Sequence, residues 1–483
     1  MQNKMSEKSY SSEMLMDSIH GAISLFEHEI MIIDHPLFQR QRFISQNDVL
    51  QFTFMGSTHT RFSHSIGALH VAQRMFKQII TNKIIAHERA TPGFKISDEQ
   101  SSAVEYLCKC LRLAVLMHDT GHGAFSHQAE KSRIVKGILE EKGCFEALWQ
   151  DCDISNIYTK SQSPLYHEHY SVRAAYEIMK DVEIKYAGIN YVDVLNIMET
   201  TDGLISDKFK MACDSIWSLF TEKTKDCNKN EINKHGNILN MLRCILSGEF
   251  DADKADYLLR DSMHSGANLG KFDLDALINS LGASWIEDED SLRLTISKKG
   301  IGSLEDMIFS RFQMYSHVYN HKTVNGVELQ LHLSIDEILS DDKNAKQMHA
   351  FMTDINEFAY LTDCFFWEKF RERARADKNS ACYGLINRIK IPFLGTFKDM
   401  NEKQIEEKKL DIAISTGIDV REIHASTHTA RFSKINNDFK DIMIEIKDPI
   451  TMKKSFKRIC EVSDFFEKFS NMRNTSFHRR RIG

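Results

Sequence analysis

The scarcity of proline is the feature that most restricts how this chain can fold. Only 5 of its 483 residues are proline, so long helices can run without interruption, because an internal proline removes a backbone donor and clashes with the preceding turn. Leucine, isoleucine, methionine and phenylalanine recur at spacings of three and four residues, which is the period of an amphipathic helix. The sequence therefore predicts a mostly α-helical protein.

The chain is long enough for a large core, and its organisation changes toward the C-terminus. We expect residues 1–334 to form one helical bundle, interrupted by a small β-hairpin at 283–298, where a strand-like run follows an acidic turn. From about 335 a charged helical stretch precedes short strand-like runs such as Ile442–Ile446. Residues 335–483 are therefore predicted to form a smaller α+β lobe with a regulatory or oligomerisation role.

Charge and hydropathy narrow the functional classes. A net charge of -6 gives no overall electrostatic reason for nucleic-acid binding, so that partner stays weakly supported, with the basic tail at 476–483 as its main local argument. The start of the chain lacks the apolar core of a signal peptide, and no apolar run approaches the ~20 residues that span a bilayer. Ten cysteines occur without any C-x-x-C pair, which is typical of reduced thiols. We expect a cytoplasmic protein without a membrane partner.

Two histidines and two aspartates could converge on one metal ion. They are His64, the adjacent pair His118 and Asp119, and Asp253, each within a helix-like segment. Mixed nitrogen and oxygen ligands suit Fe, Mn, Zn or Ni better than Mg or Ca, which prefer oxygen. A single such histidine is more often a hydrogen-bonded core residue, so the metal hypothesis rests on the joint pattern. It favours hydrolysis as the chemistry.

Basic and aromatic residues accompany these four. Asp253, Tyr257 and Asp261 are spaced by four and share a helix face, while Arg61 precedes His64 by three residues. Guanidinium and ammonium groups beside a metal site favour a phosphate-bearing substrate. A further polar stripe is predicted from the spacing of Arg311, Tyr315, Tyr319 and Lys322.

These strings resemble the HD-domain phosphohydrolases, and within them the deoxynucleoside triphosphate (dNTP) triphosphohydrolases of the SAM-and-HD-domain and bacterial dGTPase type. The resemblance runs from Asp17 to about Lys322. It rests on Asp17-Ser-Ile-His-Gly, Arg61-Phe-Ser-His64-Ser-Ile-Gly, His118-Asp119-Thr-Gly-His122-Gly-Ala-Phe-Ser-His127, His167-Glu168, Asp253-Lys254-Ala-Asp256-Tyr257 and the run from Arg311 through Tyr319 to Lys322.

The resemblance implies an HD-domain bundle and a role for each matched residue. The metal ligands would be His64, His118, Asp119 and Asp253. His127 would protonate the departing 5′-oxygen, and the residues assisting it would be His122, His167 and Glu130. The triphosphate would be held by Arg61, Lys254, Tyr257 and Arg311. The sugar would contact Gln46, Asp261 and Tyr319, with Tyr319 excluding a 2′-hydroxyl.

The resemblance also implies regulation. Asp34, Gln39 and Arg42, together with Lys322, match positions that bind an activating nucleotide in the family, and a homo-oligomer (dimer, tetramer or hexamer) is expected. The chain departs from the family pattern in three places: Glu130 stands where Asp is common, Asn47 replaces an apolar residue beside Gln46, and Met14 to Met16 lack the Asn and Lys expected upstream of the activator residues. An activator site and the sugar and base selectivity are therefore open to change.

The leading interpretation is a dNTP triphosphohydrolase that releases deoxynucleoside and triphosphate, with a transition metal at the His/Asp site and Mg or Mn accompanying the nucleotide. Its service would be dNTP pool control or antiviral defence against phage. One alternative is an HD phosphohydrolase that acts on a cyclic nucleotide, an alarmone or a nucleic-acid end. Another is a catalytically silent nucleotide-sensing protein.

Overall fold

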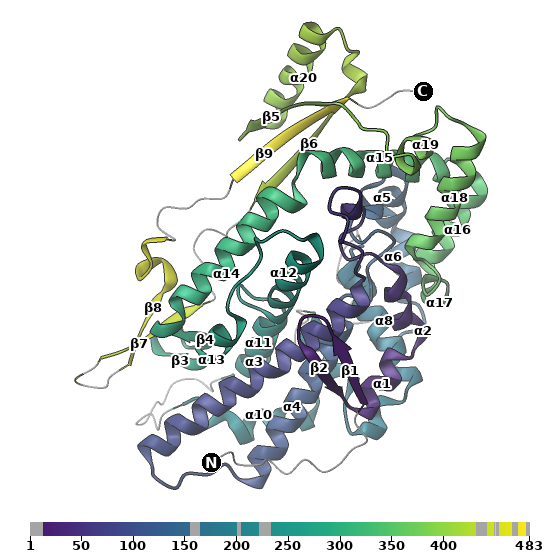
Figure 1. The fold of residues 1–483 in the computed structure, drawn as a ribbon. Helices are drawn as coiled ribbons and strands as arrows, with labels where there is room; N and C mark the ends of the chain where they lie inside the picture. Colours follow the sequence, from purple (N-terminus) through teal and green to yellow (C-terminus); the bar gives the residue numbers. More distant parts are fainter. Residues whose placement is uncertain are drawn as a thin grey trace.

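A computed structural model gives the fold of the chain (Figure 1). It describes residues 13–154, 165–199, 204–221, 233–430, 442–448, 450, 454–465 and 472–479. Helices dominate these residues, and the strands form three small sheets. The prediction of a mostly α-helical protein with a few small β elements is confirmed.

Three helices that pack side by side carry the centre of the bundle. They are α3 (Arg61–Ala90), α4 (Asp98–Met117) and α12 (Ala252–Ser265), and α3 contacts both of the others. Ser97 begins α4 with a capping box, in which its hydroxyl and the Gln100 side chain each satisfy a backbone N–H of the other residue. Buried apolar side chains fill the space between these helices. This packing fixes the positions of α3, α4 and α12 relative to one another.

Local sequence fixes both ends of α12. The Asp251 carboxylate accepts a hydrogen bond from the Lys254 backbone N–H at 2.7 Å, which caps the first turn. Gly266 ends the helix with a φ of 71°, a left-handed conformation that glycine adopts without steric cost. Asp253 therefore lies in the first turn of a well-defined helix.

Shorter helices surround this centre. On the N-terminal side they are α1 (Glu27–Ile33), α2 (Pro36–Gln39), α5 (Arg133–Glu140), α6 (Lys142–Leu148), α8 (His167–Asp181), α9 (Tyr191–Met198), α10 (Asp207–Trp217) and α11 (Lys234–Ser247). After α12 they are α13 (Leu274–Asn279), α14 (Ile301–Met314), α15 (Lys322–Leu339), α16 (Asp342–Thr353), α17 (Ile355–Phe358), α18 (Asp363–Ala376), α19 (Ala381–Ile386) and α20 (Glu402–Thr416). Single 3-10 turns occupy η1 (Arg40–Phe43), η2 (Leu50–Phe52), η3 (Ala129–Lys131), η4 (Ile184–Ala187), η5 (Glu287–Glu289), η6 (Lys298–Gly300), η8 (Val420–Glu422) and η9 (Ile459–Glu461).

The predicted hairpin is present, and the C-terminal part of the chain extends it. Strand β3 (Leu281–Ile286) pairs with β4 (Ser291–Ser297) in antiparallel fashion. Strand β7 (Met443–Lys447) then pairs with β4 in parallel, and β8 (Lys454–Arg458) pairs with β7. A four-stranded sheet results, in the order β3-β4-β7-β8.

The predicted domain boundary at 334/335 falls inside a continuous helix, α15. Helices α16, α18 and α19 contribute to the main core, through residues such as Phe351, Phe366 and Leu385. A separate small core lies farther along, where Ile412 of α20 packs with Ile423 and Phe477. It accompanies a sheet in the order β5 (Phe393–Lys398), β9 (Met472–Arg479) and β6 (Ile423–Ala430).

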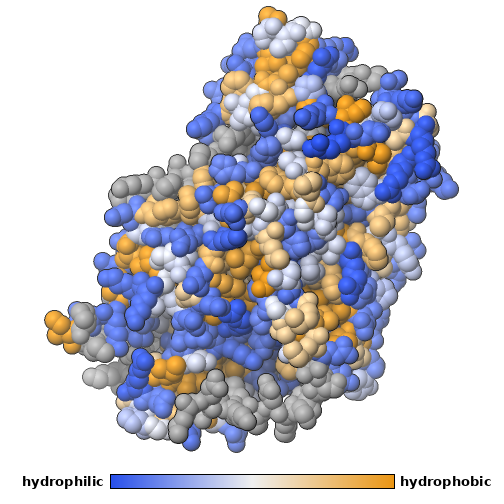
Figure 2. Space-filling view, in the orientation of Figure 1, coloured by the Kyte–Doolittle hydropathy of each residue, from blue (hydrophilic) through white to orange (hydrophobic). Residues whose placement is uncertain are grey.

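Two further features concern the outside of the molecule. Strands β1 (Glu13–Asp17) and β2 (Gly21–Leu25) form an antiparallel pair beside the bundle (Figure 1). Hydrophobic colour gathers over α20 at the tip in Figure 2, where Leu410 and Ile414 are exposed. Within the described residues, no helix combines the length and hydropathy needed to cross a membrane.

Candidate active site

The four predicted metal ligands meet where α3, α4 and α12 converge. His64 comes from the first turn of α3, His118 and Asp119 follow the last turn of α4, and Asp253 comes from the first turn of α12. The Nε2 atom of His64 lies 3.1 Å from an Asp253 oxygen and 3.5 Å from an Asp119 oxygen. The Nε2 atom of His118 lies 3.4 Å from Asp119 and 3.6 Å from Asp253.

The hydrogen bonding of the two histidines fits a metal ion. His64 Nδ1 donates to the Asp256 carboxylate at 2.8 Å, and His118 Nδ1 donates to the Val115 carbonyl at 2.7 Å. Each bond to Nδ1 leaves the Nε2 lone pair available, which is how a metal-binding histidine is usually held. Both Nε2 atoms are buried and make no hydrogen bond within the described residues. Ligand atoms of His64, His118 and Asp119 lie within 4.8 Å of one another.

The electrostatics of this cluster favour positive charge at its centre. Burial lowers the pKa of His64, but the neighbouring carboxylates of Asp253 and Asp256 outweigh it and raise that pKa to about 10. Burial raises the pKa of Asp119, but Arg61 and His118 outweigh it and hold that pKa well below its usual range. Ionised carboxylates that stabilise a protonated imidazole would also stabilise a metal cation there.

Asp256 belongs to the Asp253-Lys254-Ala-Asp256-Tyr257 motif, from which no role was predicted for it. In the structure it lies directly behind His64. It accepts hydrogen bonds from His64 Nδ1, from His20 Nε2 at 2.8 Å, and from two nitrogens of Arg260. Arg260 in turn donates to Asp17 at 2.8 Å. The spacing of Asp253 and Asp256, three residues apart on one helix, was the available signal, because such residues share a face.

Close packing explains one glycine of the motif. Gly67 lies one turn after His64, and a Cβ atom there would overlap the Asp256 carboxylate and the Arg260 guanidinium. A larger residue would therefore displace the group that orients His64.

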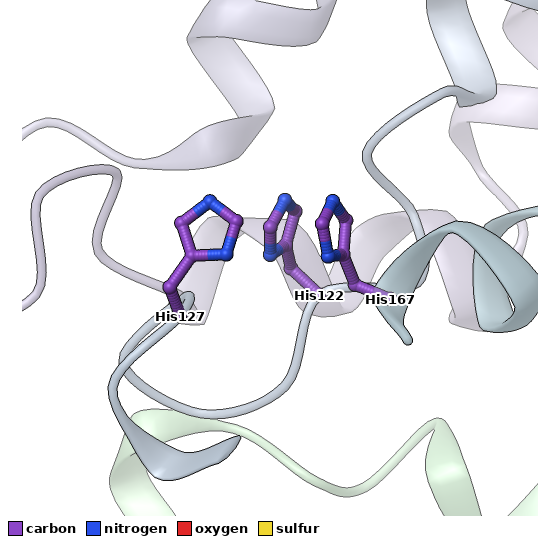
Figure 3. A group of neighbouring side chains, drawn as sticks. All are labelled: His122, His127 and His167. Atoms are coloured by element: carbon purple, nitrogen blue, oxygen red, sulfur yellow. The ribbon is translucent and has the colours of Figure 1, made fainter. Parts of the chain in front are cut away.

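Three histidines form a second cluster beside the first (Figure 3). The rings of His122 and His167 are stacked with centroids 4.0 Å apart, and His127 meets both nearly edge-on at 4.5 and 4.9 Å. His122 Nε2 lies 3.3 Å from Asp119 and links the two clusters. The fold thus brings together the three histidines that the resemblance assigned to proton transfer.

These histidines are neutral when the cavity holds no anion. The surrounding groups desolvate His127 and lower its pKa to about 4, and the positive charge of Arg61 contributes to this lowering. Burial and the neighbouring His127 lower the pKa of His167 to about 3. Burial and the nearby Glu168 carboxylate raise the pKa of Glu130 to about 7.

A cavity of about 1050 Å³ connects these groups. It is lined by thirteen of the predicted site residues, namely Gln46, Arg61, Asp119, His122, His127, Glu130, His167, Asp253, Lys254, Tyr257, Asp261, Arg311 and Tyr319. Residues that sequence reasoning gave no role also line it, among them Asp48, Gln128, Lys131 and Glu328. Their signal was weak, because ordinary polar residues far apart in sequence meet only in the folded chain.

The predicted phosphate-binding residues differ in availability. Arg61 donates through Nε to the Ser126 hydroxyl at 2.7 Å and pairs with Asp119. Arg311 is buried, with its guanidinium beside the Tyr315 ring. Lys254 reaches the cavity wall, but its ammonium donates to the Gly248 carbonyl at 2.6 Å and pairs with Asp251. Lys254 must release that pairing to contact a phosphate.

One wall of the cavity includes Tyr319 and Asp261, and His59 holds Asp261 in place. The Tyr319 hydroxyl donates to Asp261 at 2.5 Å, and His59 Nε2 donates to the other Asp261 oxygen at 2.7 Å. Residues Tyr315–Tyr319 form one turn of π-helix (η7) that follows α14. Such turns occur frequently at functional sites, since they redirect side chains.

The stripe predicted from Arg311 to Lys322 is only partly correct. The helix ends after Tyr319, and α15 begins at Lys322, so the four-residue spacing does not carry through this break. Lys322 is exposed and lies with its ammonium 5.4 Å from the Phe393 ring centroid, in a smaller cavity.

The predicted activator residues do not all come together within the chain. Arg42 donates to Gln39 at 2.8 Å, and both lie near Asp34 in sequence, at the surface after α1. Lys322 lines the smaller cavity, which none of these three residues lines. A shared nucleotide site made from all four remains a prediction.

Comparisons with known proteins agree with the resemblance. The family model described as "HD associated region" matches residues 272–427. An uncharacterized protein of Methanocaldococcus jannaschii is 27% identical over 396 residues, which are 81% of this chain and 64% of that protein. The human deoxynucleoside triphosphate triphosphohydrolase SAMHD1 is 27% identical over 367 residues, which are 74% of this chain and 50% of that enzyme.

Solved structures share the fold. A phosphohydrolase of Bacteroides thetaiotaomicron aligns with a TM-score of 0.64 at 21% identity, covering 97% of this chain and 100% of that chain. A hypothetical protein of Aquifex aeolicus aligns with a TM-score of 0.62 at 19% identity, covering 97% and 96%. The curated relatives named above are longer, since the matched part spans about half to two thirds of their length.

Proposed function

Because the chain is related to the HD-domain phosphohydrolases, we propose that it hydrolyses deoxynucleoside triphosphates to deoxynucleoside and triphosphate. One observation carries the proposal: the His/Asp cluster, the cationic Arg61 and Arg311, and the Tyr319 wall all line or border one cavity. Guanidinium groups beside a metal-binding cluster match a triphosphate in charge and shape.

The metal would be held by His64, His118, Asp119 and Asp253, and the available Nε2 atoms and the mixed ligand set favour Fe, Mn, Zn or Ni. When bound, such an ion supplies an activated water and polarises the α-phosphoryl group. Magnesium or manganese would accompany the nucleotide. Asp256 is the positioning residue, because it fixes the tautomer of His64.

Proton transfer to the leaving 5′-oxygen is assigned to His127. Its ring is open to the cavity, and the neutral His122 and His167 lie against it. A triphosphate would offset the charge of Arg61, which lowers the pKa of His127 in the empty cavity. Substrate binding would therefore protonate the general acid where it is needed. Glu130, which lines the same cavity, would assist this proton transfer.

The remaining residues would bind the phosphates and the sugar and would exclude a 2′-hydroxyl. Arg61 and Arg311 would hold the phosphates, with Tyr257 and a rearranged Lys254 beside them. Gln46 and Asp261 would contact the sugar, and the Tyr319 ring would occupy the space that a 2′-hydroxyl needs.

We also propose that a nucleotide regulates the activity of this protein. The chain would act as a homo-oligomer controlled by a nucleotide, with Asp34, Gln39, Arg42 and Lys322 as activator ligands brought together between subunits. Its biological role would be the control of dNTP pools or the depletion of precursors for phage replication. The cytoplasm, where these substrates occur, is the proposed location.

The deciding experiment supplies purified protein with Mn and each of the four dNTPs, singly and mixed, and separates the products by chromatography. Deoxynucleoside and intact triphosphate are the expected products, and Asp119→Ala should form neither. Turnover in mixtures alone would indicate activation by a second nucleotide. Release of monophosphate or orthophosphate, or hydrolysis of cyclic nucleotides or alarmones in place of dNTPs, would replace the proposal with the corresponding HD phosphohydrolase activity.

A further inference from the structure

A second set of metal-ligating side chains lies outside the large cavity. It consists of Glu141, Cys144 and His349, none of which lines that cavity. A carboxylate oxygen of Glu141, the sulfur of Cys144 and a ring nitrogen of His349 all lie within 4.8 Å of one another. Since His349 is remote in sequence from the other two residues, only the folded chain brings the three together.

Helix packing holds the three side chains in place. Glu141 ends α5 and begins α6, and the backbone N–H of Cys144 donates to the Glu141 carbonyl at 3.1 Å in the first turn of α6. His349 belongs to α16, which contacts both α5 and α6 (Figure 1). The backbone therefore presents the three ligand atoms together without any rearrangement.

The distance between Glu141 and His349 fits a shared ion better than a direct hydrogen bond. His349 Nε2 lies 3.4 Å from a Glu141 carboxylate oxygen, whereas charge-assisted hydrogen bonds between nitrogen and oxygen span about 2.7–2.9 Å. Two ligand atoms that are each held about 2.1 Å from one tetrahedral ion lie about 3.4 Å apart. The spacing of this pair therefore matches that around a zinc-type ion.

Burial and charge also suit an ion at the surface. Cys144 is fully buried, while the side chains of Glu141 and His349 are 55% and 48% exposed. The sulfur thus lies beneath two ligands that solvent reaches, and water has access from outside. A thiolate and a carboxylate together balance the charge of a divalent ion, so the buried sulfur carries no uncompensated charge when the ion is bound.

We propose that Glu141, Cys144 and His349 bind a divalent transition metal of the zinc type, with water as the fourth ligand. Sulfur and imidazole ligands favour zinc over magnesium and calcium, which prefer oxygen. The Cys144 thiol, whose pKa burial raises to about 11, releases its proton to solvent when the ion binds.

This ion has a consequence for the cavity. Helix α5 lines the cavity through Lys136, Leu139 and Glu140, and Glu141 follows directly. An ion shared with His349 ties the end of this wall to α16. The site is separate from the His/Asp cluster, whose ligands are nitrogen and oxygen alone.

The test titrates cobalt, as a spectroscopic substitute for zinc, into the full chain with Mn supplied to the His/Asp cluster. Cobalt bound by a thiolate shows a sulfur-to-metal charge-transfer band in the near ultraviolet, which the nitrogen and oxygen ligands of the His/Asp cluster cannot produce. Wild type should show this band, and added zinc should remove it by displacing cobalt. Cys144→Ala should lack the band. Cys364→Ala, which changes an exposed cysteine of α18, should keep it.

The other two ligands are tested by affinity. His349→Gln and Glu141→Gln should each weaken cobalt binding, read from the same band, by at least about tenfold, because even a partner outside the ligand set contributes about ten- to a hundredfold. Glu146→Gln is the matched control, since Glu146 is an exposed carboxylate on α6 that pairs with Lys142. It should leave the affinity unchanged.

Absence of the band in wild type, its persistence in Cys144→Ala, or unchanged affinity in both His349→Gln and Glu141→Gln would overturn the site. The side chains of His349 and Glu141 are about half exposed, so these two variants decide the question even if Cys144→Ala does not fold. None of the readouts requires turnover, so the result is independent of the proposed function.

Discussion

The Asp256 carboxylate lies 2.8 Å from Nδ1 of His64 and orients the opposite ring nitrogen toward Asp119 and Asp253. The same carboxylate is bound by Arg260 and His20, so its position is fixed from three sides. A carboxylate that holds a metal-binding histidine in this way usually contributes ten- to a hundredfold to metal affinity or activity.

Asp256→Asn should therefore weaken Mn binding by about ten- to a hundredfold, and excess Mn should restore turnover. A purely structural defect would not respond to metal in this way. Asp275→Asn is the control, because Asp275 is an exposed carboxylate on α13 that pairs with Arg74. Unchanged Mn affinity in Asp256→Asn, measured by titration calorimetry, would contradict the assignment.

Asp119→Ala should abolish both bound transition metal and turnover. Asp119 faces His64, His118 and His122 at the centre of both clusters, and loss of one ligand from a small set weakens binding sharply. Elemental analysis of the purified variant measures the metal directly. Full occupancy would remove Asp119 from the ligand set.

His127→Ala should keep its metal and bind nucleotide but lose about two to four powers of ten in turnover, the usual contribution of a positioned general acid. Near-normal turnover with a natural leaving group would exclude His127 from the mechanism.

Nucleotide binding should raise the pKa of His127. In the empty cavity this pKa is lowered to about 4, so the ring is neutral at pH 7. A triphosphate favours the protonated form, because it adds negative charge near Arg61. Exchange of the histidine C2 hydrogen, followed by mass spectrometry with a non-hydrolysable dNTP, should show a rise of one unit or more. His70, whose pKa is also lowered to about 4 but which does not line the cavity, should not shift.

Tyr319 should act as a steric gate, so wild type should reject ribonucleotides. Its ring is held by the hydrogen bond to Asp261, and a 2′-hydroxyl desolvated without a partner costs on the order of 1–3 kcal/mol. Tyr319→Ala should accept ATP with metal content intact. Tyr319→Phe retains the ring without the hydroxyl and should still discriminate. Equal hydrolysis of ATP and dATP by wild type would show that no gate operates.

Asp363 should make folding stability depend on pH. It is buried at the start of α18 and accepts the backbone N–H groups of Phe125 at 2.6 Å and Ser45 at 2.9 Å. Burial raises its pKa to about 6. Its stabilising contribution is therefore complete below about pH 4, the usual value for an unfolded aspartate, and is lost as the pH rises through 6.

The free energy of unfolding of wild type, relative to Asp363→Asn, should thus fall by about 3 kcal/mol between pH 4 and pH 7. Denaturant titrations of both proteins across this range give the difference. A difference that stays constant with pH would show that Asp363 keeps an ordinary pKa in the folded state.

The sequence alone predicted the helical class and the hairpin, from the helix period and turn chemistry, and it grouped His64, His118, Asp119 and Asp253 by their ligand chemistry. The other candidate site residues, from Gln46 to Tyr319, were predicted from the resemblance to a family, and most of them line one cavity. The prediction for Lys322 was wrong as part of the stripe, because a spacing rule assumes a continuous helix and η7 ends one.

Tertiary packing decided what no local pattern encodes. The pairing of β7 with β4 joins residues about 150 positions apart. Helix α15 brings Glu328 to Gln128, whose side-chain amide donates hydrogen bonds to both Glu328 and Asp48. The engagement of the Lys254 ammonium by Asp251 and the contact of Asp363 with two loops of the site are likewise products of folding. The sequence by itself determined which chemical groups and helices are available, because these follow from neighbours along the chain. Only the folded chain determined which groups are paired, buried and charged, because those properties depend on distances between segments remote in sequence.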